Sequence, residues 1–128
     1  MLALGVLGFA SSAAQAAISI VSTAPSAGMT TITLNSSSAA TGHLTVLQGT
    51  VSCGSVLQTQ TGLDSTGTAA YRRGSLSLAA ATNANYTVRN LSQATSYTLC
   101  ATNGTDSASA NFSTSAMAAF GSAAWANV

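Results

Sequence analysis

Apolar and polar residues alternate in short runs along most of the chain, and clusters of Gly, Asn, Ser and Pro separate the runs. Alternation with a period of two is typical of a β-strand that buries one face, and regularly spaced short strands favour a sandwich or barrel. The runs lie at 18–21, 29–34, 43–48, 75–78, 85–90, 96–102 and 109–114. A further stretch, 55–58, is a candidate for a short edge strand. We therefore expect an all-β protein, a two-sheet antiparallel sandwich of about seven strands.

The alternation also predicts which side chains form the core. In the run 96–102, Tyr97, Leu99 and Ala101 share one face, which we expect to point inward. Cys100 then points outward, because successive side chains on a strand lie on opposite faces. The same reasoning places three further pairs inside: Ile32 with Leu34, Leu44 with Val46, and Tyr86 with Val88.

The N-terminal segment has a different character from the rest of the chain. Residues 2–10 form an unbroken apolar or small run, and Ala14-Gln15-Ala16 is a small-x-small cleavage signal. This pattern predicts a signal peptide over residues 1–16, with Ala17 as the mature start and no membrane span in the mature form. No Lys or Arg precedes the run, so either the true start lies upstream or Met1 lies inside the signal. A buried first segment of the fold is the alternative.

Charged residues make up only 4% of the chain, with no Lys and no Glu. The charged positions are Asp64, Asp106, Arg72, Arg73 and Arg89. Nucleic acids and anionic lipids require clustered Lys and Arg, so a net charge of +1 predicts neither partner. The abundant Ser, Thr, Asn and Gly favour strands, turns and caps over helices.

Two cysteines, Cys53 and Cys100, fit an oxidising compartment. An even number of cysteines in a small exported domain favours one disulfide, and two free thiols are the alternative. A metal site would need more ligands than these two thiols and His43 supply, so we expect no metal.

The sequence offers little for catalysis. His43 is the single histidine and falls on an expected strand, where it serves as an exposed polar position. Asp64 and Asp106 fall in expected turns, where Asp caps backbone groups. No exposed-serine elbow and no glycine-rich phosphate loop occurs. We therefore predict no enzyme activity and no cofactor.

Tyr71, Arg72 and Arg73 form the one sequence cluster that could bind a ligand, by stacking on a sugar or a base. The alternative is a solvated loop whose charges protect an edge strand from pairing with another chain.

The segment 91–99, Leu-Ser-Gln-Ala-Thr-Ser-Tyr-Thr-Leu, resembles the turn between the fifth and sixth strands of fibronectin type III domains. There a Leu plugs the core, and a Tyr six residues later buries its ring while its hydroxyl bonds to the turn backbone, a tyrosine corner. Leu91 and Tyr97 match these two positions. Gln93 stands where a Pro is usual, which makes the turn less rigid.

Further segments are similar to a bacterial variety of this fold that occurs in large surface and secreted proteins. They are a Gly-started strand at 42–48, a Gly-Leu-Asp-Ser-Thr-Gly segment at 62–67, and a Gly-Ser-x-x-Leu strand at 74–78. The resemblance covers residues 17–115 and implies an immunoglobulin-like or fibronectin type III-like sandwich. In that frame, a Cys53–Cys100 bond pins the loop after the third strand onto the outer face of a neighbouring strand.

Residues 116–128 break the alternation and hold the single Trp. They are either a tail that packs back on its own domain, or a linker that begins a further domain.

These features are compatible with three functions. The first is a structural, spacer or adhesion module of a secreted or cell-surface protein, whose partners are neighbouring domains of a larger chain. The second is a binding module for a surface glycan or a protein. The third is a self-assembling surface-fibre subunit, because the low charge leaves strand edges poorly protected.

Overall fold

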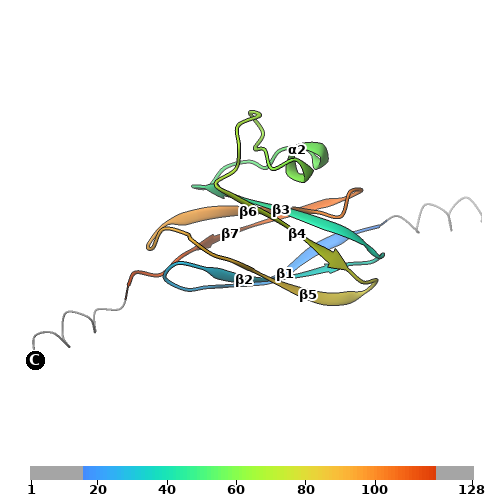
Figure 1. Ribbon diagram of the computed structural model, residues 1–128, viewed down its shortest axis with the longest axis horizontal. Coiled ribbons are helices and arrows are strands. Elements are labelled where there is room, and N and C mark those ends of the chain that lie inside the picture. Colours follow the sequence, from blue (N-terminus) through green and yellow to red (C-terminus); the bar gives the residue numbers. More distant parts are fainter. Residues whose placement is uncertain (1–15, 118–128) are drawn as a thin grey trace, which may run out of the picture.

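The computed structural model describes residues 16–117 and has an all-β architecture in this range. Its elements are β1 (Ile18–Pro25), β2 (Thr30–Ser36), β3 (Ala40–Gln48), α2 (Val56–Gln60), β4 (Arg72–Leu78), β5 (Thr82–Val88), β6 (Ser96–Thr102) and β7 (Ser107–Ser113). The strands form two sheets with the orders β1-β2-β5 and β4-β3-β6-β7, and every neighbouring pair is antiparallel (Figure 1). The predicted two-sheet sandwich is therefore confirmed.

The core lies between the two sheets. Residues that the alternation assigned to the inside are buried there: Ile32, Leu34, Leu44, Val46, Val88, Tyr97, Leu99 and Ala101. Tyr86 is half-buried and packs against this cluster. The ring of Tyr97 lies at the centre of an aromatic group, with its centroid 5.5 Å from those of both Tyr71 and Phe112. A period of two thus separates inward-facing from outward-facing side chains on these strands.

The connection between β5 and β6 joins the two sheets. Leu91 is buried in the core, and its backbone N–H donates to the carbonyl of Gly28 at 3.0 Å. The next residue, Ser92, donates its N–H to the hydroxyl of Tyr97 at 2.8 Å. The Ser92 carbonyl accepts from the hydroxyl of Thr114 at 2.6 Å. Leu91 and Tyr97 therefore lie in the arrangement that a tyrosine corner requires.

The expected edge strand at 55–58 is wrong, because this stretch begins the short helix α2. The hydroxyl of Ser55 accepts from the Gln58 N–H at 3.1 Å, and the Gln58 side-chain oxygen accepts from the Ser55 N–H at 2.8 Å. This reciprocal pair is a capping box, which satisfies two backbone donors at the start of a helix.

The segment between β3 and β4, which includes α2, lies over the outer face of the four-stranded sheet (Figure 1). As a result, β3 and β6 are covered on both faces. Thr45, Leu47, Thr98 and Cys100 point away from the core, yet each is buried. A sandwich with one solvated face per sheet would have left all four exposed.

The outermost strands of the sheets are β1, β5, β4 and β7. In β1 the pairing with β2 shifts between Ile20 and Ser22, which leaves Val21 in a bulge and 51% exposed. The same strand ends at Pro25, which has no N–H to offer a further strand. Both features interrupt the row of backbone groups that an edge strand presents.

The predicted signal peptide, residues 1–16, lies outside the described residues except for Ala16. The predicted tail, 116–128, does so except for its first two positions. Within 16–117, no helix combines the length and the apolar character that crossing a bilayer would require.

Candidate functional site

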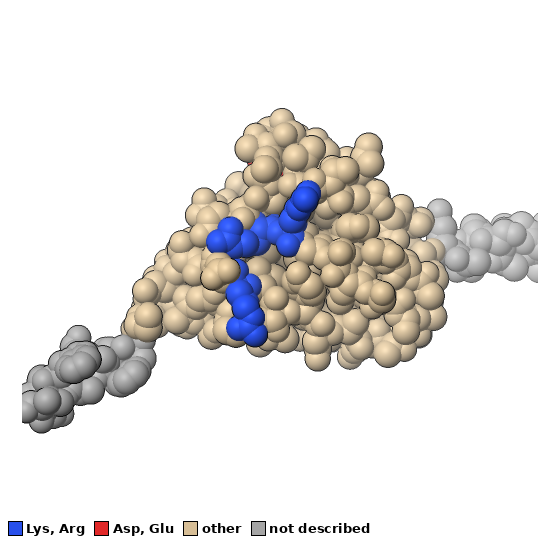
Figure 2. Space-filling view, in the orientation of Figure 1, with Lys and Arg blue, Asp and Glu red and all other residues tan. Residues whose placement is uncertain are grey.

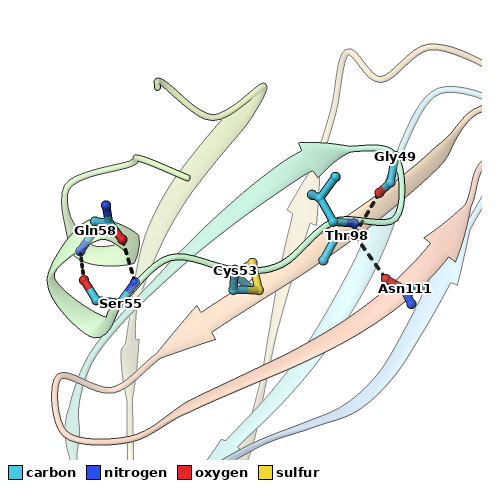
Figure 3. Close-up of a disulfide and its surroundings, with 8 residues drawn as sticks. Gly49, Cys53, Ser55, Gln58, Thr98 and Asn111 are labelled. Atoms are coloured by element: carbon cyan, nitrogen blue, oxygen red, sulfur yellow. Dashed lines mark hydrogen bonds between the residues drawn. A yellow bond between two sulfur atoms is a disulfide. The ribbon is translucent and has the colours of Figure 1, made fainter. Parts of the chain in front are cut away.

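A disulfide joins Cys53 to Cys100, with the two Cα atoms 5.8 Å apart and a sequence separation of 47 (Figure 3). It attaches the segment between β3 and β4, residues 49–71, to the outer face of β6; we call this the covering segment. The predicted disulfide is thus confirmed. Cys100 points away from the core as expected but is only 1% exposed, since the covering segment lies over it.

Thr98, two residues before Cys100 on the same face, holds the start of the covering segment. Its hydroxyl donates to the carbonyl of Gly49 at 2.8 Å and accepts from the N–H of Val51 at 3.1 Å (Figure 3). It also lies 3.1 Å from the side-chain oxygen of Asn111 on β7. A threonine can therefore be buried here, because its hydroxyl is fully paired.

Both aspartates hold backbone groups in turns. Oδ1 of Asp64 accepts from the N–H groups of Thr66 and Thr68, at 2.8 and 2.9 Å, and from the Thr66 hydroxyl at 2.7 Å. The Thr66 hydroxyl bond, followed by the backbone bond from Thr68, lowers the pKa of Asp64 below its ordinary value of 3.8. Asp106 accepts from the N–H of Ile18 at 3.1 Å and so ties the β6–β7 turn to the start of β1.

The three side chains of the Tyr71-Arg72-Arg73 cluster do not share one site: Arg72 lies with Tyr71, and Arg73 lies apart from them. Arg72 lies at the start of β4, where its guanidinium donates to the carbonyls of Tyr71, Asn90 and Arg89 at 2.8, 2.8 and 3.4 Å. Its Cζ atom lies 4.6 Å from the centre of the Tyr71 ring. A hydrogen bond with the Ser92 hydroxyl is the main cause that lowers the pKa of Tyr71. This pair joins β4 to the β5–β6 connection.

Arg73 points to the other side of β4 and donates to the carbonyl of Thr61 at 2.9 Å. The third arginine, Arg89, follows β5 and lies 3.8 Å from the sulfur of Met29. Figure 2 shows the arginines as one continuous stripe across a face of the molecule on which no acidic side chain is visible. We call Arg73, Arg72 and Arg89 the arginine stripe. The sequence did not place Arg89 in this group.

A cleft of about 290 Å³ lies beside Arg73, between the α2 region and the outer face of β3 and β4. We call it the Arg73 cleft; its lining includes His43, Thr59, Gln60, Arg73 and Ser75. His43 is half-buried rather than exposed, and its Nδ1 atom is buried without a hydrogen-bond partner among the described residues. Strand pairing creates this site, because His43 on β3 is in register with Ser75 on β4.

Sequence reasoning missed the Arg73 cleft. The sequence pattern places His43 at an exposed position of an expected strand and Arg73 outside the expected strands, but it does not say which strands pair or with what register. The helix that closes the cleft was also missed. Within residues 16–117, no three His, Cys, Asp or Glu side chains gather closely enough to hold a metal ion.

No protein-family model matches this sequence, and no curated protein is significantly similar to it.

Proposed function

We propose that this chain is a non-catalytic structural or adhesion module, of the fibronectin type III-like kind, in a bacterial secreted or cell-surface protein. The observation that carries the proposal is the placement of the two ends of the sandwich. β1 begins at one end of the long axis of the molecule, and the chain leaves β7 at the other end (Figure 1). A domain whose chain enters at one end and leaves at the other can be placed in a row of domains, and each added domain then lengthens the row.

The use of the reactive side chains supports the same proposal. Cys53 and Cys100 are crosslinked, while Asp64 and Asp106 accept backbone N–H groups. Arg72 donates to three carbonyls. Side chains that elsewhere perform chemistry here hold the backbone in place.

The strand order supports the fibronectin type III-like assignment. Here β4 pairs with β3, so the β4-β3-β6-β7 sheet has four strands and the β1-β2-β5 sheet has three. In constant-type immunoglobulin domains, the sheet that corresponds to β1-β2-β5 has four strands and its partner sheet has three. The hydrogen bond from the Ser92 N–H to the Tyr97 hydroxyl also supports the assignment, because the resemblance was based on a tyrosine corner at this turn.

Two features support export. A structural disulfide persists in oxidising compartments and is rare in the reducing cytosol. The outer face of the β1-β2-β5 sheet carries neutral cross-strand hydrogen bonds in place of ion pairs, from Thr33 to Asn85 and from Asn35 to Asn83, each at 2.8 Å. These features accord with the signal peptide expected over residues 1–16.

Expression of the full chain in a bacterium with an oxidising periplasm tests the export part. We expect the protein outside the cytoplasm, with its first residue at Ala17 and no free thiol. Retention in the cytoplasm with both cysteines reduced would contradict it.

The spacer part is tested by fusing two copies of residues 17–128 head to tail. We expect small-angle X-ray scattering to show a particle about twice as long as the single copy. A fused pair that folds back side by side would count against a spacer.

The bulge at Val21 and the proline at position 25 make β1 a poor template for strand addition. The structural module is therefore preferred here over the fibre subunit.

A further inference from the structure

We infer that the arginine stripe and the Arg73 cleft together bind a linear carboxylated polysaccharide, with one acidic sugar seated in the cleft. The inference gives the module a ligand, which the proposed structural role does not require. It would stand even if the domain were no spacer.

Arg73 supplies the carboxylate partner. A guanidinium presents five N–H donors in a planar fork that matches the two oxygens of a carboxylate. The hydrogen bond that Arg73 makes within the described residues goes to the Thr61 carbonyl and uses Nη1. Arg73 is exposed, so the rest of its fork can meet a ligand at the edge of the cleft.

The other side chains of the Arg73 cleft suit a ligand rich in hydroxyl groups. Ser75, Thr59 and Gln60 offer neutral donors and acceptors, and His43 adds an imidazole. Buried polar atoms are normally hydrogen-bonded, and Nδ1 of His43 has no such bond with the described residues. That atom is itself buried, so a sugar in the cleft would meet the accessible part of the half-buried imidazole rather than Nδ1.

The size of the cleft limits what it can hold. At about 290 Å³, it lies just below the range of about 300–1,000 Å³ that is typical of small-molecule sites. One sugar ring is a suitable occupant, whereas a larger ligand would have to continue outside the cleft.

The arginine stripe provides a path for that continuation. Arg72 is next to Arg73 in sequence and donates to the Arg89 carbonyl, and the arginines form one stripe on the surface (Figure 2). Arg72 contributes charge, but its guanidinium is engaged with three backbone carbonyls. Arg89 is exposed, and its side chain contacts the sulfur of Met29 rather than a carboxylate. Two arginines at separate points of one stripe fit a polymer with repeated negative charges better than a single small acid.

A polysaccharide fits this surface better than a nucleic acid. Proteins bind single strands by stacking bases on aromatic rings. The Tyr71 ring beside the stripe is covered by Arg72 and packs at 5.5 Å against Tyr97, so it offers no free face of this kind. Duplex binding depends on many phosphate contacts, and the chain has three cations in all.

Isothermal titration calorimetry on the exported, oxidised protein tests the inference. The probe is a hexamer of galacturonic acid, and the matched control is a hexamer of galactose, which has the same ring without the carboxylate. We expect the acidic hexamer to bind and the neutral hexamer to give no measurable heat.

Variants then locate the site. Arg73→Gln should weaken binding of the acidic hexamer by about tenfold or more, because it removes a charged hydrogen-bond donor pair. Arg89→Gln should weaken the hexamer but leave the affinity for a single galacturonic acid unchanged, since the single sugar occupies only the cleft. A single cooperative thermal unfolding transition for each variant shows that both fold.

Any of four results would overturn the inference. They are no binding of the acidic hexamer, equal binding of the neutral hexamer, an Arg73→Gln variant that binds like the wild type, and a thymidine oligonucleotide that binds as tightly as the acidic sugar at the same salt concentration. None of these results bears on export or on the spacer role.

Discussion

Cys100 lies on the outward face of β6 and is 1% exposed, because Cys53 is bonded to it and brings the segment after β3 across that face. The central strands β3 and β6 are therefore covered on both sides, by the core and by this segment. The same segment contains α2, whose residues Thr59 and Gln60 line the Arg73 cleft. The crosslink thus connects the stability of the sandwich with the shape of its candidate ligand site.

Replacing both cysteines with Ala should lower the free energy of unfolding by about 4 kcal/mol, the chain-entropy value for a closed loop of this length. Urea unfolding measures the change. A reducing agent should destabilise the wild type by a similar amount and leave the double variant unaffected. A double variant as stable as the oxidised wild type would show that the disulfide does not constrain the fold.

Tyr97→Phe keeps the buried ring and removes the hydroxyl that accepts the Ser92 N–H. We expect a loss of about 1 kcal/mol in unfolding free energy, since one hydrogen bond disappears. Tyr86→Phe is the matched control, because the Tyr86 hydroxyl forms no hydrogen bond with other described residues, and its effect should stay within about 0.5 kcal/mol. Equal effects of the two substitutions would argue against a special role for the Tyr97 corner.

Gly74→Ala should disturb the contact between β4 and β5. A Cβ atom at position 74 would collide with the hydroxyl of Tyr86 and lie 2.5 Å from its Cζ. Overpacking of this kind costs about 1–3 kcal/mol. Gly28→Ala is the control, because its Cβ would meet only the Leu91 carbonyl oxygen, at an ordinary 3.5 Å. Thermal unfolding of both variants should separate them clearly, and equal midpoints would refute the proposed collision.

The turn around Asp64 should open in acid. Its pKa is lowered in the folded state, so the unfolded chain binds the proton more tightly. The stabilising effect is therefore complete above the ordinary value of 3.8 and is lost as the pH falls below that value and through the folded-state pKa. The amide resonances of Thr66 and Thr68 should report a transition below pH 3.8, which Asp64→Asn should abolish. A transition at or above 3.8 would contradict the lowered pKa.

Much of the fold could be predicted from alternation. On β2 and β6, branched or aromatic residues recur at every second position, so the strands and their inward faces followed directly. β4 was predicted too short, because Arg72, Arg73 and Gly74 are not typical strand formers. Pairing with Val46, Thr45 and Leu44 on β3 nevertheless extends the strand to them.

The missed elements have physical reasons. α2 has five residues, which is too few for a helical period to show. The one usable signal was the Ser-x-x-Gln capping box at Ser55. Thr45 and Thr98 are polar and point away from the core, yet the segment that the disulfide attaches to β6 lies over this face and both are buried. The cleft could not be predicted for a further reason: it depends on the register between two strands.

The most direct measurement is peptide mapping of the exported protein, alkylated under native, non-reducing conditions. We predict a single crosslinked peptide pair that contains Cys53 and Cys100, with neither thiol alkylated. Recovery of both cysteines in alkylated form would contradict the covering segment held against β6, and would remove the disulfide from the features that support export.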